Sequence, residues 1–96
     1  MTKARIMVVE DDGIVAARLE DVLQQMGYDV VAVLATGEEA IEQAGVLHPD
    51  LALMDIRLRE KMTGIEAAAH LRRGWDIPVV YLTAYADESL LRQAQV

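Results

Sequence analysis

The stretches IMVVEDD (residues 6–12) and LALMD (residues 51–55) determine the architecture of this chain. Each is a short run of apolar residues that ends in acidic ones. Such runs are typical of parallel strands that are covered on both faces of a sheet. The carboxyl ends of parallel strands meet at one edge of the sheet, and ligands of open α/β sheets bind at that edge. We therefore expect Glu10, Asp11 and Asp55 to converge there.

Carboxylates that share one crevice repel each other, and this repulsion raises their pKa values unless a cation joins them. A hard divalent ion with oxygen ligands, above all Mg²⁺, suits such a group. The sequence thus predicts an acidic Mg²⁺ site built from Glu10, Asp11 and Asp55.

Length and charge narrow the class of protein. The 96 residues are enough for one domain or part of one. A net charge of −7, from 9 basic and 16 acidic residues, argues against binding to nucleic acid or to an anionic membrane surface. No apolar run approaches the roughly 20 residues that span a bilayer. Cysteine is absent, which excludes disulfides and is compatible with a cytoplasmic location.

Strands and helices alternate along the chain, which predicts a doubly wound parallel α/β sheet. We expect strands at residues 5–9, 28–34, 51–54 and 79–83. Capping-box patterns at Thr36 and Thr63 predict the starts of two helices, which should end at His48-Pro49 and at Gly74. A polar loop is expected at residues 56–62 and a last helix at residues 86–96.

The first helix, which follows residue 12 and stops at Gly27, should carry one apolar face. That face contains, at helical spacing, Ile14, Val15, Leu19, Val22, Leu23 and Met26.

The chemistry open to Asp55 beside a bound cation is phosphoryl transfer. A carboxylate can attack a phosphorus centre and hold the phosphoryl group as an acyl phosphate, while the metal offsets the charge. Thr83 ends the neighbouring strand and would place its hydroxyl at the same edge. On this interpretation Asp55 is the phosphoacceptor, Glu10 and Asp11 hold the metal, and Thr83 is the switch residue that senses the phosphate.

Four features stand in a characteristic order: the pair Glu10-Asp11, Asp55 within LMDIRL (53–58), Gly64 at the next helix, and VVYLTA (79–84). Together they resemble the receiver domain of two-component response regulators, over the whole of residues 1–96. The resemblance implies a flavodoxin-like sheet and dependence on Mg²⁺. It also implies a phosphoryl donor that is a histidine kinase or a histidine phosphotransfer protein. The backbone carbonyl of Arg57 would be a further metal ligand, and the backbone N–H of Ala84 would contact the phosphate.

The chain departs from the family at two places. The loop from Asp55 to Gly64 is one residue longer than the commonest pattern. The family's fifth strand, with its catalytic lysine, and its fifth helix are expected to be missing, because neither Lys3 nor Lys61 has that lysine's place. We therefore expect a receiver truncated after the start of its fourth helix, with strand order 2-1-3-4. The strand at 79–83 would be an open edge, which invites a homodimer or a swapped partner.

Receivers transfer a phosphoryl group to themselves, so we do not expect an enzyme that turns over a pool of substrate. Three alternatives stay open: a degenerate receiver that acts only as an interaction module, a flavin- or nucleotide-binding domain, and a Mg²⁺-dependent phosphohydrolase. The loop after residue 9 is acidic rather than a phosphate cradle, which disfavours the second. Arg57 stands where the third would have its acid/base aspartate.

Overall fold

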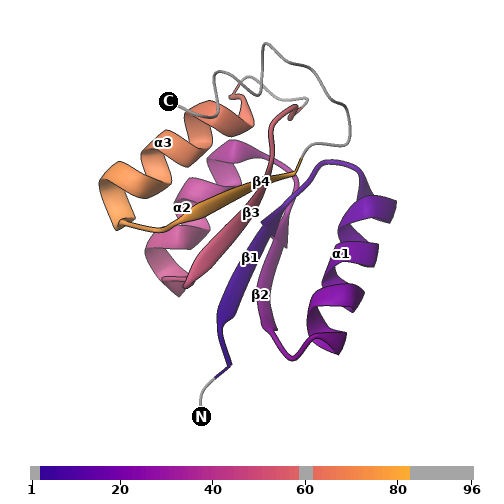
Figure 1. Cartoon of the computed structure of the whole chain (residues 1–96). Coiled ribbons are helices and arrows are strands. Elements are labelled where there is room, and N and C mark those ends of the chain that lie inside the picture. The colour runs from indigo at the N-terminus through magenta and orange to yellow at the C-terminus, as the bar shows by residue number, and fades with distance from the viewer. Residues whose placement is uncertain (1–2, 59–61, 83–96) are drawn as a thin grey trace.

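The computed structural model describes residues 3–58 and 62–82, which form a parallel sheet with helices on both faces (Figure 1). In chain order the elements are β1 (Arg5–Val9), α1 (Gly13–Gln25), β2 (Asp29–Leu34), α2 (Gly37–Leu47), β3 (Leu51–Asp55), α3 (Gly64–Trp75) and β4 (Val79–Leu82). The four strands are ordered β2-β1-β3-β4, and every pair is parallel. The predicted doubly wound sheet is confirmed. The last helix that we expected, at residues 86–96, lies outside the described residues.

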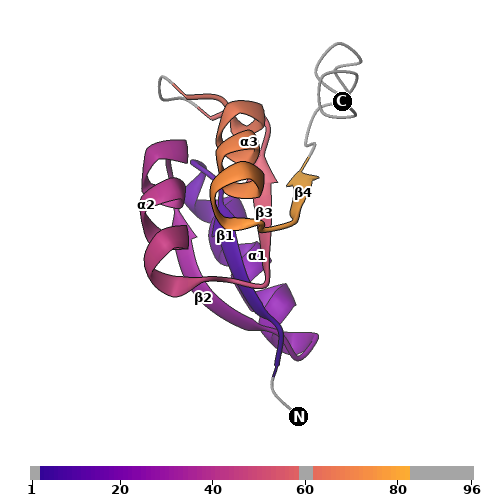
Figure 2. The same cartoon turned by 90° about the vertical axis from the view of Figure 1, so that its left-hand side faces the viewer.

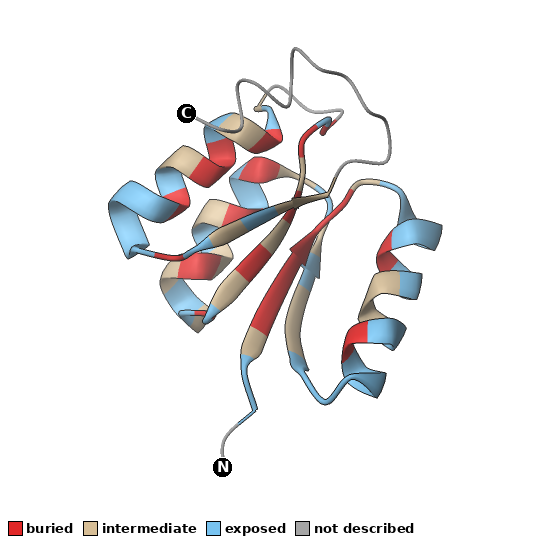
Figure 3. Ribbon diagram, viewed as in Figure 1, coloured by how far each residue is buried: buried red, intermediate tan, exposed pale blue. Residues whose placement is uncertain are grey.

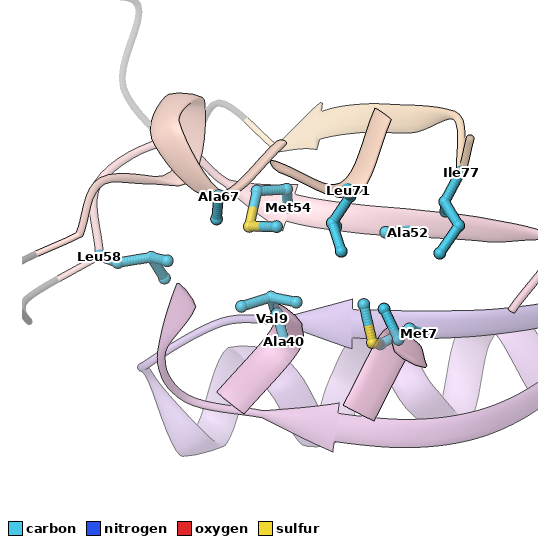
Figure 4. Close-up of a cluster of buried hydrophobic side chains, with 10 residues drawn as sticks. Met7, Val9, Ala40, Ala52, Met54, Leu58, Ala67, Leu71 and Ile77 are labelled. Atoms are coloured by element: carbon cyan, nitrogen blue, oxygen red, sulfur yellow. The ribbon is translucent and has the colours of Figure 1, made fainter. Parts of the chain in front are cut away.

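One face of the sheet packs on α2 and α3, which lie side by side in both views (Figures 1 and 2). Inward-facing side chains of β1 and β3 interlock there with small residues of the two helices. The alanines let the helix backbones come close to the sheet. Figure 4 shows this cluster of buried residues: Met7, Val9, Ala40, Ala44, Ala52, Met54, Leu58, Ala67, Leu71 and Ile77.

Among the described elements, α1 is the helix on the opposite face, and only part of its apolar face meets the sheet. Ala16 and Leu23 are buried and Leu19 is half-buried, so a narrow line of side chains meets the sheet. The other residues of the apolar face are exposed: Ile14 to 84% and Met26 to 65%, with Val15 and Val22 also exposed. Among the described elements no second helix lies beside α1, so its apolar arc is wider than its contact with the sheet.

Two further expectations need correction. Helix α3 passes through Gly74 and ends at Trp75, because Asp76 takes a left-handed conformation (φ 54°) and its N–H donates to the carbonyl of Leu71. Aspartate tolerates that conformation better than most residues. The loop after β3 is also not simply polar, because Ile56 and Leu58 are buried.

The capping predictions are confirmed where the structure tests them. Thr63 and Glu66 form a complete capping box at the start of α3. At α2 the hydroxyl of Thr36 accepts from the N–H of Glu39, and His48 ends the helix in a left-handed conformation. Among the described residues no helix has both the length and the apolar character that a bilayer crossing requires.

We predict that Leu71→Ala lowers the free energy of unfolding by about 2 to 5 kcal/mol, because it opens a cavity in the cluster between α3 and the sheet. Urea denaturation measures the change. Val46→Ala, at a position that is 69% exposed on α2, is the control and should change stability by less than about 0.5 kcal/mol. Equal effects of the two substitutions would contradict the described packing.

Candidate functional site

The carboxyl edge of the two central strands brings the predicted acidic residues together. Asp55 is the last residue of β3, and Glu10 follows directly after β1. These strands are parallel neighbours, with Val9 opposite Met54. The N–H of Glu10 also donates to the carbonyl of Leu34 at 2.9 Å, which extends the pairing of β1 with β2 by one residue. The backbone at Glu10 is therefore fixed on the edge that Asp55 shares.

Glu10, Asp11 and Asp55 form a compact acidic cluster. Each offers a carboxylate oxygen, and these three oxygens lie within 4.8 Å of one another. Glu10 is buried, with 8% of its surface exposed, whereas Asp11 and Asp55 are half-buried. Figure 3 shows that buried residues of β1 and β3 lead up to this edge. The convergence that the sequence predicted is therefore present.

The environment of Glu10 disfavours its charged form. Burial, and after it the neighbouring Asp55 carboxylate, raise the pKa of its carboxyl from 4.5 to about 7. The backbone amide of Asp12 opposes this shift by donating to the carboxylate. Near neutral pH, Glu10 thus either keeps a proton or adds a further negative charge to the cluster. A bound cation would offset that charge.

Asp55 is held in place by the chain that follows it. Its Oδ1 accepts from the backbone N–H of Arg57 at 3.1 Å. The N–H of Gly64, at the start of α3, donates to the carbonyl of Ile56 at 3.0 Å. A Cβ on Gly64 would lie 1.9 Å from the carbonyl oxygen of Asp55. Only glycine allows α3 to start this close to the phosphoacceptor candidate.

Asp12, the acidic residue after Glu10 and Asp11, is the N-cap of α1. Its side chain accepts from the N–H groups of Ile14 and Val15. An aspartate directly before a helix is a recognisable capping signal, so this role could have been found from the sequence.

Some predicted residues cannot be placed. Thr83, Ala84 and Lys61 lie outside the described residues. Arg57 is exposed and its N–H binds Asp55, while the role of its carbonyl as a ligand stays a prediction. Lys3 precedes β1 and so lies toward the amino edge of the sheet, away from the cluster.

The donor set suits a hard divalent cation. All three side chains offer carboxylate oxygens, which Mg²⁺ and Ca²⁺ prefer, and the set contains no sulfur or imidazole ligand that would favour zinc. The three oxygens lie within 4.8 Å of one another, so one hard cation could be held among them. The residues present therefore fit the predicted Mg²⁺.

Comparison with known proteins gives a consistent result. A family model described as the response regulator receiver domain matches residues 6–95. Among curated proteins, the transcriptional regulatory protein PdtaR of Mycobacterium tuberculosis is 32% identical over 91 residues, which are 95% of this chain and 44% of that protein. The DNA-binding response regulator MtrA of Mycolicibacterium paratuberculosis is 40% identical over 85 residues, 88% of this chain and 37% of that protein. The chain thus spans less than half the length of these relatives.

Solved structures agree. The signal receiver domain of a modulated diguanylate cyclase from Desulfovibrio desulfuricans G20 superposes with a TM-score of 0.92 at 37% identity, covering 98% of this chain and 75% of that one. The receiver domain of the putative response regulator NarL from Mycobacterium tuberculosis gives a TM-score of 0.88 at 28% identity, with 99% and 77% coverage.

We predict that Gly64→Ala destabilises the protein by at least about 2 kcal/mol, because the added Cβ collides with backbone rather than with a flexible side chain. Gly74→Ala in the same helix is the matched control. A Cβ there meets nothing within 4 Å, so this substitution should stabilise α3 by about 0.5 to 1 kcal/mol. Chemical denaturation of both variants measures the contrast, and the same sign for the two would be inconsistent with the close approach of α3 to Asp55.

We also predict that the metal-free protein loses stability as the pH rises from about 4.5 to about 7. Between these values folded Glu10 keeps a proton that the unfolded chain releases, so raising the pH favours unfolding. The expected loss is roughly 1 to 3 kcal/mol.

The test is urea unfolding of the wild type and of Glu10→Gln across this pH range, in the presence of a chelator. The difference between their free energies of unfolding isolates Glu10 from other carboxyls. A constant difference across the range would refute the raised pKa.

Proposed function

We propose that this chain, which belongs to the family of response regulator receiver domains, accepts a phosphoryl group on Asp55 and relays the event as a change in shape or partner affinity. The observation that carries the proposal is the convergence of Glu10, Asp11 and Asp55 within 4.8 Å at one sheet edge. A single aspartate at the end of a strand would not support this function. Three acidic side chains at the ends of two adjacent strands of a receiver domain support it.

In the proposed reaction an oxygen of the Asp55 carboxylate forms a bond to phosphorus. The phosphorus–nitrogen bond to a histidine of the donor breaks, and the leaving imidazole takes up one proton. Glu10, Asp11 and the carbonyl of Arg57 would hold Mg²⁺, which offsets the charge of the carboxylates and the phosphoryl oxygens. The N–H of Arg57 already orients the Asp55 carboxylate in this structure.

We propose Thr83 as the switch residue and the N–H of Ala84 as a phosphate contact. Leu82 pairs with Asp55 across β3 and β4. Thr83 and Ala84 follow Leu82 directly, which supports a place for these two residues beside the phosphoacceptor. A new phosphoryl group adds acceptor oxygens toward which the Thr83 hydroxyl would turn, and the residues that follow would shift with it.

Receiver domains in general act with histidine kinases or phosphotransfer proteins, and we propose such a donor here, in the cytoplasm. The transfer is self-directed, so the domain would not turn over a substrate pool. We do not propose binding to nucleic acid or membrane by these residues, given the net charge of −7. A homodimer or a swapped partner likewise stays a proposal.

The test is intact-mass measurement after incubation with acetyl phosphate and Mg²⁺. We expect one phosphoryl adduct on the wild type, which needs Mg²⁺ and is absent from Asp55→Asn. Asp29→Asn, at an exposed position at the start of β2, is the matched control and should still be modified.

An adduct that persists in Asp55→Asn would place the acceptor elsewhere. No adduct on a folded protein that binds Mg²⁺ would support the alternative, a degenerate receiver that acts as an interaction module.

A further inference from the structure

We propose that Asp12 is a positioning residue of the acidic cluster: by capping α1, its side chain fixes the backbone amide that orients the Glu10 carboxylate. The inference rests on the proposed function, since it concerns how the same Mg²⁺ site is kept in order. It assigns to Asp12 a role that is neither metal ligand nor phosphoacceptor.

The contacts form a continuous chain from α1 to the cluster. Oδ1 of Asp12 accepts from the N–H of Ile14 at 3.0 Å and from that of Val15 at 3.2 Å. The carbonyl of Asp12 accepts from the N–H of Ala16 at 2.9 Å, the first intrahelical bond. The N–H of Asp12 in turn donates to Oε2 of Glu10 at 3.3 Å. The side chain and the carbonyl of Asp12 thus bind the helix, and its N–H binds Glu10.

Glu10 needs such a restraint more than its two partners do. It has the longer side chain and is buried close to the carboxylates of Asp11 and Asp55, so its ionised form meets like charge. A donor on Oε2 stabilises the ionised carboxylate and leaves its other oxygen for a metal. Donors that orient ligands in this way are a general means of tuning metal sites.

Asp12 does not act as a ligand in this arrangement. Its side chain is exposed and is not among the three carboxylates whose oxygens converge. Its Oδ1 is already engaged by two amides of the helix. What the site needs from residue 12 is therefore a capping oxygen, and not specifically a negative charge.

The test is the affinity for Mg²⁺ measured by isothermal titration calorimetry. Asp12→Ala removes the cap and should weaken Mg²⁺ binding roughly tenfold. Asp12→Asn and Asp12→Ser keep a capping oxygen without the charge, and both should restore affinity to within about twofold. Titrations at high ionic strength screen the lost charge and should bring these two closer still to the wild type.

Thr36→Ala is the matched control, because it removes the N-cap of α2, a helix with no residue in the cluster. It should lower stability about as much as Asp12→Ala but leave Mg²⁺ affinity unchanged. If Asp12→Ala does not fold, Asp12→Gly removes the same oxygen at little cost to the helix, and the same loss of affinity is expected.

Two results would overturn the inference alone: equal affinities of the wild type and Asp12→Ala, or Asn and Ser variants as weak as the Ala variant. A wild type that binds no Mg²⁺ would overturn the proposed metal site together with the inference. These outcomes are distinguishable, because the first two require a wild type that binds.

Discussion

Electrostatic repulsion among three carboxylates is the interaction around which this molecule is arranged. Without the fold, the side chains of Glu10, Asp11 and Asp55 would move apart, because each carboxylate is better stabilised by water than by neighbours of the same charge. Two adjacent strands hold them together at a shared edge, and the buried cluster beneath those strands makes the edge rigid. The close start of α3 at Gly64 and the cap of α1 at Asp12 brace the same edge from two sides. The stability of the fold thus sustains an arrangement that is unfavourable without a cation.

This arrangement links metal and protons. Because burial and the neighbouring carboxylates raise the pKa of Glu10 to about 7, Glu10 keeps its proton more readily near neutral pH than an ordinary glutamate does. A cation that binds Glu10 would have to displace that proton, so the affinity of the proposed Mg²⁺ site should rise with pH over this range. On the proposed function, the cation would complete the site.

Much of the fold could be predicted, and the failures have physical reasons. Runs such as residues 6–9 and 51–54 favour strands, because a continuous apolar stretch of that length suits a strand buried on both faces and is too short for a typical helix. For α1, periodicity shows which residues are apolar but not how narrow the contact of the helix with the sheet is. Gly74 did not end its helix, because the left-handed residue turned out to be Asp76.

For the site, the sequence was enough to predict that the acidic residues lie together, because the carboxyl ends of neighbouring parallel strands share one edge of the sheet. The hydrogen bond from Asp12 to Glu10 and the close approach of Gly64 to the carbonyl of Asp55 depend on distances in the folded structure. A one-dimensional pattern contains no such distances. Thr83 and Ala84 stay predictions because they lie outside the described residues.

The strand order has a consequence for how the protein is made. β1 is central, yet its partner β3 is synthesised more than forty residues later, with Ile6 opposite Leu51. At ordinary rates of translation, roughly 5 to 20 residues per second, β1 is complete several seconds before β3. The three carboxylates can meet only after Asp55 has been synthesised, so the acidic cluster is a late feature of the sheet.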